Sequence, residues 1–551
     1  MAQQLGGQPI LILREGTKQS RDEETRSSNF AAAKAVAGAV RSTLGPHGMD
    51  KMLVDSLGDV VITNDGATIL KELDIEHPAA KMIVEVAKTQ DDETGDGTTT
   101  AVVIAGELLK AAEGLIAKKI HPTVIAEGYR QAAEQAQDVL AGISLAVRPG
   151  DEEVLRKIAQ TAFTSRLSEP AKDIFCVFMV KAAGLVADPD GKVDIGHITI
   201  VKKAGAAVED SVMVDGVVVD KERMHPSMPK VIRDAKILLL NAAIEFRKTE
   251  VNAKITITGT QQVQAFLDKE AHMVRAMAEK VIASGTNVLF CQKGIDDVIA
   301  HYLAKAGILA VRRVKKSDME NLTRATGASV VNSSDAITAK DIGSAGLVAE
   351  KKFAGEEMIA VSGCNNPRAV TILIRGGSQH VIDELERSVH DGLMVIKDVL
   401  EDGRMVAGGG APEVEIALRL RDYAMMQGGR RQPAIEAFAS AFTVIPRTIA
   451  ENSGLDPIDA VVALKTAHER GEVNAGLDVK TGKPADMPTA GILEPLRVKK
   501  QAVASATDAA VMILRIDDMI ASSKAPGPAM PPGGMGGMGG MGGMPPGMGE
   551  Y

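Results

Sequence analysis

The sequence is poor in aromatic residues: it contains no tryptophan, and Phe, Trp and Tyr together make up 3% of its 551 residues. Stacking platforms for nucleic acids and aromatic cages for peptides depend on such side chains, so the composition argues against both. The 72 acidic residues outnumber the 63 basic ones. This mild negative charge argues against a protein that coats DNA or RNA, and we expect no nucleic-acid partner.

Cysteine is scarce as well. Cys176, Cys291 and Cys364 lie far apart and form neither a CxxC pair nor a zinc-binding spacing. Free thiols in a reducing compartment are therefore expected. No apolar run is long enough to span a bilayer, and the first residues lack the apolar core of a secretory signal. We expect a cytoplasmic protein without a membrane partner.

Common catalytic motifs are also missing. Gly191-Lys192 and Gly482-Lys483 are followed by valine and proline, so neither continues as a Walker A loop. The HExxH, G-x-S-x-G and EF-hand patterns do not occur. These absences remove the simplest support for a P-loop ATPase, a zinc hydrolase or an α/β-hydrolase. The 45% apolar and 25% charged residues are typical of a folded globular protein.

The pattern of apolar residues changes along the chain. The first 150 residues are mostly helical in pattern, with a short strand at 60–63, an Asn-Asp-Gly turn and a helix from Ala67. From about Val193, short β-rich runs alternate with helical stretches, which is typical of an α/β domain. We expect strands at 198–201, 212–219, 237–240, 254–258, 310–314, 328–331 and 370–375, and helices at 29–43, 101–119, 262–282 and 295–305.

After Glu384 the sequence is helical and alanine-rich again, as far as Ile520. One economical explanation is that the two helical blocks form a single discontinuous domain into which the α/β part is inserted. Residues 525–551 consist mainly of glycine, methionine and proline. Such a segment cannot bury enough surface to offset its ordering entropy, so we expect a flexible tail.

The segment Gly95-Asp96-Gly97-Thr98-Thr99-Thr100 precedes a long predicted helix. Its glycines would let the backbone approach an anion, and the N–H groups at a helix start carry the positive end of the helix dipole. An aspartate in such a loop suits a Mg²⁺ ion that bridges to phosphate. The competing explanation is an ordinary Asp-Gly turn with a threonine N-cap.

Two further glycine-rich segments and two acidic residues are also candidates for a phosphate-binding site. Residues 44–48 (LGPHG) fit a helix end and turn, and residues 406–412 (VAGGGAP) fit either close approach of a ligand or a tight helix-to-helix turn. Asp65 follows a strand and Asp391 lies in a predicted helix. Phosphoryl transfer to water needs a metal ligand and a group that orients the water, and carboxylates serve both needs. The usual explanation for either acid is a solvated surface position.

Taken together, these segments resemble the group II chaperonins of the thermosome type, from about Lys18 to Lys524. The resemblance rests on long motifs in the right order. They are LGPHGMDKMLVDSLGDVVITNDGATILKEL (44–73), IEHPAAKMIVEVA (75–87), GDGTTT (95–100), LFCQKGIDD (289–297), HYLAKAG (301–307), ERSVHDGL (386–393) and AGGGA (407–411). The Gly-Met tail also resembles that of many chaperonins.

The resemblance implies an α/β multidomain fold and a double ring of subunits around a chamber. A mostly helical equatorial domain would bind ATP at 1–150 and 404–524, an intermediate hinge domain would occupy 151–219 and 370–403, and an α/β apical domain would face substrate at 220–369. A helical lid protrusion is implied at about 250–281. Its partners would be unfolded protein clients, other copies of the chain and possible paralogous subunits, and its cofactors ATP and Mg²⁺.

The same resemblance implies residue roles. Asp391 would orient the attacking water, Asp65 would lie beside the γ-phosphate, and Asp96 would hold Mg²⁺. The remaining nucleotide contacts implied are Gly45, Pro46, Asn64, Gly97, Thr98, Thr99, Thr100, Thr164, Ser165, Gly409, Gly410, Glu494 and Lys499. Because Asp391 lies outside the equatorial blocks, closure would assemble the catalytic site.

Two departures from the family pattern stand out. A lysine that contacts the γ-phosphate is often found where this chain has Glu169, and the lysine after Leu-Gly-Pro is His47 here. The leading hypothesis is an ATP-driven protein-folding chamber. The alternatives are a mixed-ring subunit with weakened or altered ATP hydrolysis, a metabolic ATPase or kinase that uses the same phosphate site, and a non-catalytic ring protein.

Overall fold

The computed structural model describes residues 2–5, 8–11, 18–148, 150–163, 168–188, 190–245, 260–353, 355–364 and 369–521. The chain forms two units, one from residues 1–26 with 516–551 and one from residues 27–515. The predicted tail at 525–551 and the expected strand at 254–258 lie outside the described residues. Within the described part, no helix is both long and apolar enough to cross a membrane.

The smaller unit contains strands from both chain ends. Strand β1 (Ala2–Leu5) pairs with β2 (Gln8–Leu11), and β3 (Lys18–Arg21) pairs with β20 (Asp518–Ala521), both antiparallel. The second pair joins segments almost five hundred residues apart in the sequence.

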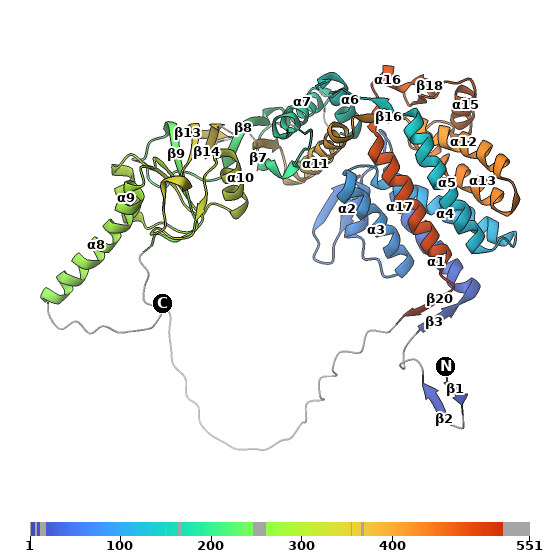
Figure 1. The fold of residues 1–551 in the computed structure, drawn as a ribbon, viewed down its shortest axis with the longest axis horizontal. Coiled ribbons are helices and arrows are strands. Elements are labelled where there is room, and N and C mark those ends of the chain that lie inside the picture. Colours follow the sequence, from blue (N-terminus) through green and yellow to red (C-terminus); the bar gives the residue numbers. More distant parts are fainter. Residues whose placement is uncertain are drawn as a thin grey trace, which may run out of the picture. The chain divides into compact units, whose positions relative to one another are not determined.

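The larger unit has a helical core that combines the two ends of its sequence (Figure 1). Helix α17 (Leu496–Leu514) packs against α3 (Pro78–Thr94), α4 (Thr98–Ala117) and α5 (Pro122–Ile143). Helix α4 is apolar on nearly every side because it lies in the middle of this core. The core also contains α1 (Asp22–Arg41), α2 (Gly66–Glu72), α12 (Ala411–Gln427), α13 (Gln432–Phe442), α14 (Val444–Asn452) and α15 (Pro457–Glu469).

A second core lies around α11 (Gln379–Asp402), a long amphipathic helix. One side of α11 packs on α6 (Glu152–Ala162) and α7 (Glu169–Val186), and it also contacts β7 (Ile198–Ala204) and β15 (Val370–Gly376). Its buried residues recur with helical spacing, from Ile382 through Val399.

The main sheet has nine strands in the order β11-β10-β9-β13-β14-β8-β15-β7, with β12 also paired to β9. In β9, Ile237 and Leu239 belong to one core while Leu238 and Leu240 belong to another, so both faces of this strand are buried. The remaining members are β8 (Val212–Val219), β9 (Val231–Leu240), β10 (Val288–Cys291), β11 (Leu309–Val311), β12 (Val330–Val331), β13 (Gly343–Phe353) and β14 (Glu356–Cys364).

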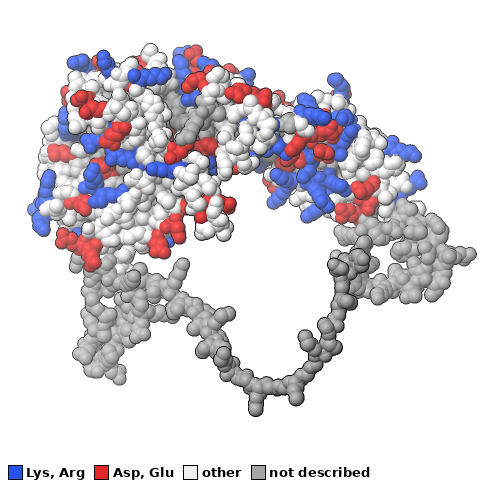
Figure 2. All heavy atoms as spheres, turned by 180° about the vertical axis from the view of Figure 1, so that it is seen from behind, with Lys and Arg blue, Asp and Glu red and all other residues white. Residues whose placement is uncertain are grey.

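Helices α8 (Thr260–Ala283), α9 (Asp297–Lys305) and α10 (Lys316–Thr326) accompany this sheet. In the last turns of α8, Val274 and Val281 are buried beside α9, so this end of the helix faces the core. Figure 2 shows lysine, arginine and acidic side chains interspersed over the face of the molecule that it presents.

Several short strands complete the larger unit. They are the hairpin β4 (Lys51–Val54) with β5 (Val60–Thr63), the three-stranded sheet of β6 (Leu145–Ala146), β16 (Arg404–Ala407) and β19 (Leu493–Pro495), and the pair β17 (Ala475–Asp478) with β18 (Lys483–Asp486). The predicted strands at 60–63 and 212–219 are confirmed at those bounds. Strands β13 and β14 and the short strands after Glu384 were not predicted.

Candidate nucleotide site

The GDGTTT segment forms the junction between α3 and α4. Gly95 ends α3 with φ 65°, and Gly97 is the N-cap of α4 with φ 77°, both in the left-handed region that favours glycine. No side chain caps α4, so its first N–H groups have no side-chain partner in the described structure and present the positive end of the helix dipole. The threonine N-cap that competed with a phosphate site is therefore wrong.

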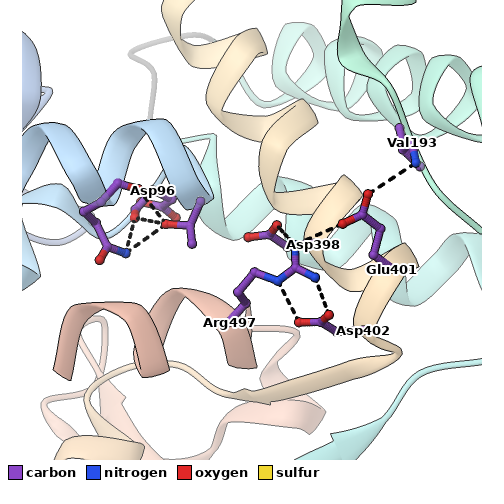
Figure 3. Close-up of polar contacts among 8 residues, drawn as sticks. Asp96, Val193, Asp398, Glu401, Asp402 and Arg497 are labelled. Atoms are coloured by element: carbon purple, nitrogen blue, oxygen red, sulfur yellow. Dashed lines mark hydrogen bonds and ion pairs between the residues drawn. The ribbon is translucent and has the colours of Figure 1, made fainter. Parts of the chain in front are cut away.

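Asp96 is fixed between these two glycines. Its carboxylate Oδ1 accepts a hydrogen bond from the Gly97 N–H at 2.6 Å. Its carbonyl oxygen accepts two more, from Gln90 Nε2 at 2.9 Å and from Thr94 Oγ1 at 3.0 Å. The loop therefore holds the Asp96 side chain by its own backbone, and the last turns of α3 hold that backbone (Figure 3).

Asp65 lies at the start of α2, next to the start of α4. Its carboxylate accepts hydrogen bonds from the backbone N–H groups of Ala67 at 3.2 Å and Thr68 at 2.7 Å, which makes it the N-cap of α2. The Thr98 hydroxyl also donates to it, at 3.2 Å. Asp65 is thus both a structural cap and a wall of the pocket, rather than a freely solvated acid.

The end of α1 reaches the same place through the LGPHG segment. The hydroxyl oxygens of Thr43 and Thr99 lie 3.4 Å apart, and Gly45 has φ 86°. Gly45 therefore turns the chain where a residue with a side chain would be strained. Pro46 is exposed and does not line the pocket.

Asp391 comes from α11 and faces the glycine loop. A Cβ atom added to Gly95 would lie 2.4 Å from Met394 Cβ and 3.7 Å from Asp391 Cα. This close approach explains why glycine is needed at position 95 and shows that α11 lies directly on the loop. The sequence could place Asp391 on a helix but not on this loop, because almost three hundred residues separate them.

These segments enclose one pocket. Its cavity volume is about 120 Å³, and it opens to the surface. Of the predicted residues it is lined by Gly45, Asn64, Asp65, Asp96, Gly97, Thr98, Thr99, Thr100 and Asp391. It is also lined by Thr43, Leu44, Gly66, Thr161, Ala162, Glu384, Arg387 and Ser388, which were not predicted.

The spacing on α11 could have indicated part of the missing set. Glu384, Arg387 and Ser388 precede Asp391 by seven, four and three residues, which places them on the same face of the helix. The segment around Thr161 has no comparable signal in the sequence.

The carboxyl groups in the pocket oppose one another electrostatically. Burial, and then the charge of Glu494, raise the pKa of Asp96 to about 6, although the Gly97 N–H lowers it. Burial also raises the pKa of Asp391 well above its usual range; the adjacent His390 lowers that pKa, and the charges of Asp65 and Asp96 raise it. A cation in the pocket would relieve this repulsion.

Mg²⁺ fits the donors that are present. It is usually held by one or two carboxylates together with waters and substrate phosphates. No group of three or more His, Cys, Asp or Glu side chains in the described structure is arranged to hold a metal alone. Asp96 could therefore act as one such carboxylate, with phosphate oxygens and waters supplying the other ligands.

Glu494 and Lys499 lie just beyond this pocket. Lys499 Nζ lies 2.6 Å from Glu494 Oε2 and 2.9 Å from Glu413 Oε1, and its side chain is almost completely buried. Neither residue lines the pocket. Glu494 is nevertheless close enough to raise the pKa of Asp96, so this buried ion cluster adjoins the glycine loop.

The run of three glycines serves a turn from β16 into α12. Gly409 and Gly410 have φ 65° and 80°, and added Cβ atoms would lie 2.8 Å from Met487 Sδ and 3.0 Å from Pro446 Cβ. Close packing of the protein on itself thus accounts for both glycines, and neither lines the pocket. The turn is strand-to-helix rather than helix-to-helix.

The remaining sequence predictions concern the start of α7. Thr164 and Ser165 lie outside the described residues. Glu169 is the first residue of α7, is exposed and does not line the pocket. An acid in the first turn of a helix interacts favourably with the helix dipole, which gives Glu169 a structural role, and altered nucleotide sensing stays a prediction.

Comparison with known proteins identifies relatives of this chain. A sequence model of the TCP-1/cpn60 chaperonin family matches residues 36–524. The thermosome subunit beta of Archaeoglobus fulgidus is 56% identical over 94% of this chain and 96% of its own length. A thermosome subunit of Pyrococcus horikoshii is 57% identical over 95% of each chain.

A solved structure agrees with these relatives. The open-state monomer of a group II chaperonin from Methanococcoides burtonii is 49% identical, with a TM-score of 0.60. The match covers 76% of this chain and all of that one. The chain therefore belongs to the TCP-1/cpn60 chaperonin family, as a group II chaperonin and an ATP-hydrolysing chaperone.

Proposed function

We propose that this chain is a subunit of a double ring that encloses unfolded proteins, and that ATP hydrolysis in the pocket around Asp96 drives closure of the chamber. The observation that carries this proposal is the convergence of the GDGTTT loop, Asp65 and Asp391 from three distant segments on one pocket. The proposed clients are unfolded or partly folded proteins, the proposed ring partners are copies of this chain or paralogous subunits, and the proposed location is the cytoplasm.

The chain's own groups suggest how ATP would be held. The uncapped N–H groups and threonine hydroxyls at the start of α4 are donors for phosphate oxygens. Asp391 faces the same loop from α11, where its carboxylate can orient a water molecule. Mg²⁺, when bound at Asp96, would neutralise charge on the phosphates. Glu494 lies near enough to Asp96 for its charge to raise the pKa of that carboxyl, and we propose it as a further nucleotide contact.

Four hydrophobic cores support a proposed division into domains. The helical core built from both ends of the larger unit is proposed as the equatorial domain, at 1–150 and 404–524. The core around α11 is proposed as the intermediate domain, at 151–219 and 370–403. The cores on the two faces of β9 are proposed as the apical domain, at 220–369, with a lid at about 250–281. Asp391 would then belong to the hinge.

The proposal is tested by imaging and enzyme assay together. Purified protein is imaged by negative stain without nucleotide and with Mg·ATP plus a phosphate analogue, and ATP hydrolysis is measured with Mg²⁺ and with EDTA. We expect double rings that change from open to closed and hydrolysis that requires Mg²⁺. Rings without hydrolysis would favour the non-catalytic alternative, and active monomers would favour a metabolic ATPase. Either result would contradict the proposal.

A further inference from the structure

Arg497, the second residue of α17, contacts three carboxylates on the last turns of α11 (Figure 3). Its Nη1 donates to Asp398 Oδ1 and to Glu401 Oε2, each at 3.0 Å. Its Nε donates to Asp402 Oδ2 at 2.9 Å, and its Nη2 donates to the other oxygen of Asp402. The guanidinium thus makes a two-pronged contact with Asp402, a geometry that a lysine cannot reproduce.

Two of these acids, Asp398 and Asp402, lie on the same side of α11 as Asp391. Asp398 and Asp402 follow Asp391 by seven and eleven residues, close to two and three helical turns, and such positions share one face. The distance from Asp391 to Asp398 along the axis is about 10 Å. One face of α11 therefore contacts the glycine loop with Asp391 and Met394, and contacts α17 with the two later acids.

The residue next to Arg497 contacts the glycine loop itself. A Cβ atom added to Gly97 would lie 2.8 Å from Val498 Cγ1. The side chain of Gln90 donates from Nε2 to the Val498 carbonyl at 3.1 Å and to the Asp96 carbonyl at 2.9 Å. The first turn of α17 is thus fixed to the loop that carries Asp96, while its Arg497 side chain holds the helix that carries Asp391.

We propose that Arg497 is a positioning residue for ATP hydrolysis, which sets the distance between Asp391 and the glycine loop by fixing α11 to the start of α17. This inference rests on the role proposed above for Asp391. Arg497 does not line the nucleotide pocket, so its effect passes through α11 rather than through contact with the substrate. The competing explanation is an ion cluster that only stabilises the fold.

The cluster has the properties that such a positioning contact needs. The Asp398 side chain is completely buried, whereas Arg497 and Asp402 are about one third exposed. Among the described residues, Asp398 Oδ2 has no hydrogen-bond partner, so Arg497 supplies the interaction that this buried carboxylate receives. Glu401 also accepts a hydrogen bond from the Val193 N–H at 3.4 Å, which ties the segment before β7 to the same point.

The primary test is Arg497→Lys in the assembled protein, because it keeps the charge and loses the two-pronged contact. We expect kcat for Mg·ATP hydrolysis to fall on the order of tenfold to a hundredfold, the usual effect of a small misplacement of a catalytic group. Affinity for ADP, measured by calorimetry, should not change. The matched control is Arg419→Lys, because Arg419 donates to the buried Glu415 on α12, away from the pocket. The control should leave both quantities unchanged.

A double-mutant cycle separates positioning from stability. In an Asp391→Ala background, Arg497→Lys should cause no further fall in residual hydrolysis, since the group that it positions is absent. The inference would be overturned if Arg497→Lys lowered hydrolysis by the same factor in both backgrounds. It would also be overturned if kcat did not change, whether or not ADP binding became weaker. If Arg497→Lys does not assemble, Asp402→Asn is used instead, with a smaller fall expected and the same contrary outcomes.

Failure of the inference can be told apart from failure of the proposed function. If Asp391→Ala abolishes turnover while Arg497→Lys hydrolyses ATP at the wild-type rate, the inference about Arg497 is wrong and the role of Asp391 stands. If Asp391→Ala hydrolyses ATP normally, the proposed function of the pocket is wrong, and the inference falls with it.

Discussion

At the scale of single residues, the chain places several carboxyl groups in buried positions, where the charged form is unfavourable. Asp96 and Asp391 share one pocket with Asp65, and Asp398 is buried two turns further along α11. Burial, more than any neighbouring charge, raises the pKa of both Asp96 and Asp398. Such sites are tolerated when a counter-charge arrives, which in the pocket would be Mg²⁺ and at Asp398 is Arg497.

Asp398 predicts a pH dependence of stability. Burial raises its pKa to about 7 although Arg497 lowers it, whereas the unfolded chain has the ordinary value of 3.8. Between about pH 4 and pH 7, Asp398 has lost its proton in the unfolded chain but keeps it in the folded chain. The free energy of unfolding should therefore decrease as the pH rises. Asp398→Asn should remove this decrease, which can be measured from thermal unfolding midpoints of nucleotide-free protein at several pH values.

The control for this prediction lies on the same helix. Although partial burial raises the pKa of Asp383, hydrogen bonds from Lys202 and Gln379 bring it below the ordinary value. The contribution of Asp383 to stability is therefore present at neutral pH and is lost as the pH falls through its lowered pKa. Asp383→Asn should therefore lower the free energy of unfolding at neutral pH. The contribution of Asp383 to stability thus changes with pH in the opposite direction from that of Asp398. Identical pH profiles for wild type and Asp398→Asn would contradict the assignment.

At the scale of elements, the start of α4 depends on glycine at position 97. Gly97→Ala would place a Cβ 2.8 Å from Val498 Cγ1 at a φ of 77°. We expect a loss of about 1–2 kcal/mol of stability from the left-handed conformation. We also expect ATP affinity to fall at least about tenfold, because about 1.4 kcal/mol of lost binding has that effect. Calorimetric titration with ATP measures the second effect.

The matched control for Gly97→Ala is Gly114→Ala, in the interior of the same helix. Among the described residues, and apart from the neighbouring backbone of its own helix, no atom lies within 4 Å of a Cβ added there, and its φ is not in the left-handed region. Alanine should stabilise the helix by up to about 1 kcal/mol and leave ATP affinity unchanged. If the two variants bind ATP equally well, the start of α4 is not the phosphate site.

Some helices and strands are easier to predict from their local sequence than others. The strand at 60–63 and the junction of α3 with α4 have strong local signals, a β-branched run before Asn-Asp-Gly and a glycine pair before alanine and leucine. Strands β13 and β14 were missed because glycine, alanine, lysine and glutamate weaken their β-propensity. They are held by pairing with each other and with β9 and β8, which is a tertiary effect.

At the scale of the whole molecule, the sequence predicts which residues suit the site better than it predicts how the fold brings them together. The three threonines, Asp96 and Asp65 are identifiable because their local pattern suits phosphate and metal. Their meeting with Asp391 depends on a helical core that joins both ends of the larger unit, and no local pattern encodes that contact. The same reason hid the buried ion cluster around Lys499.

The order of helical, α/β and helical segments suggested that the two helical blocks form one domain, and the resemblance to chaperonins implied the same pairing. Packing of α17 on α3, α4 and α5 agrees with one core built from both blocks. The structure also corrects one prediction, since the turn at Gly409 and Gly410 leads from β16 to α12 rather than from helix to helix, and these two glycines pack on Met487 and Pro446. Contact with a nucleotide at Gly409 and Gly410 stays a prediction.

The most direct test of the central claim is ATP hydrolysis in a single turnover by Asp391→Ala, with ATP affinity measured on the same sample. The account predicts that this variant binds Mg·ATP with wild-type affinity and forms the same rings, but converts the bound ATP to ADP only at a small residual rate. Its reason is that α4 and Asp96 would hold the phosphates, whereas Asp391 on α11 would orient the attacking water. Hydrolysis of bound ATP at the wild-type rate would contradict the account.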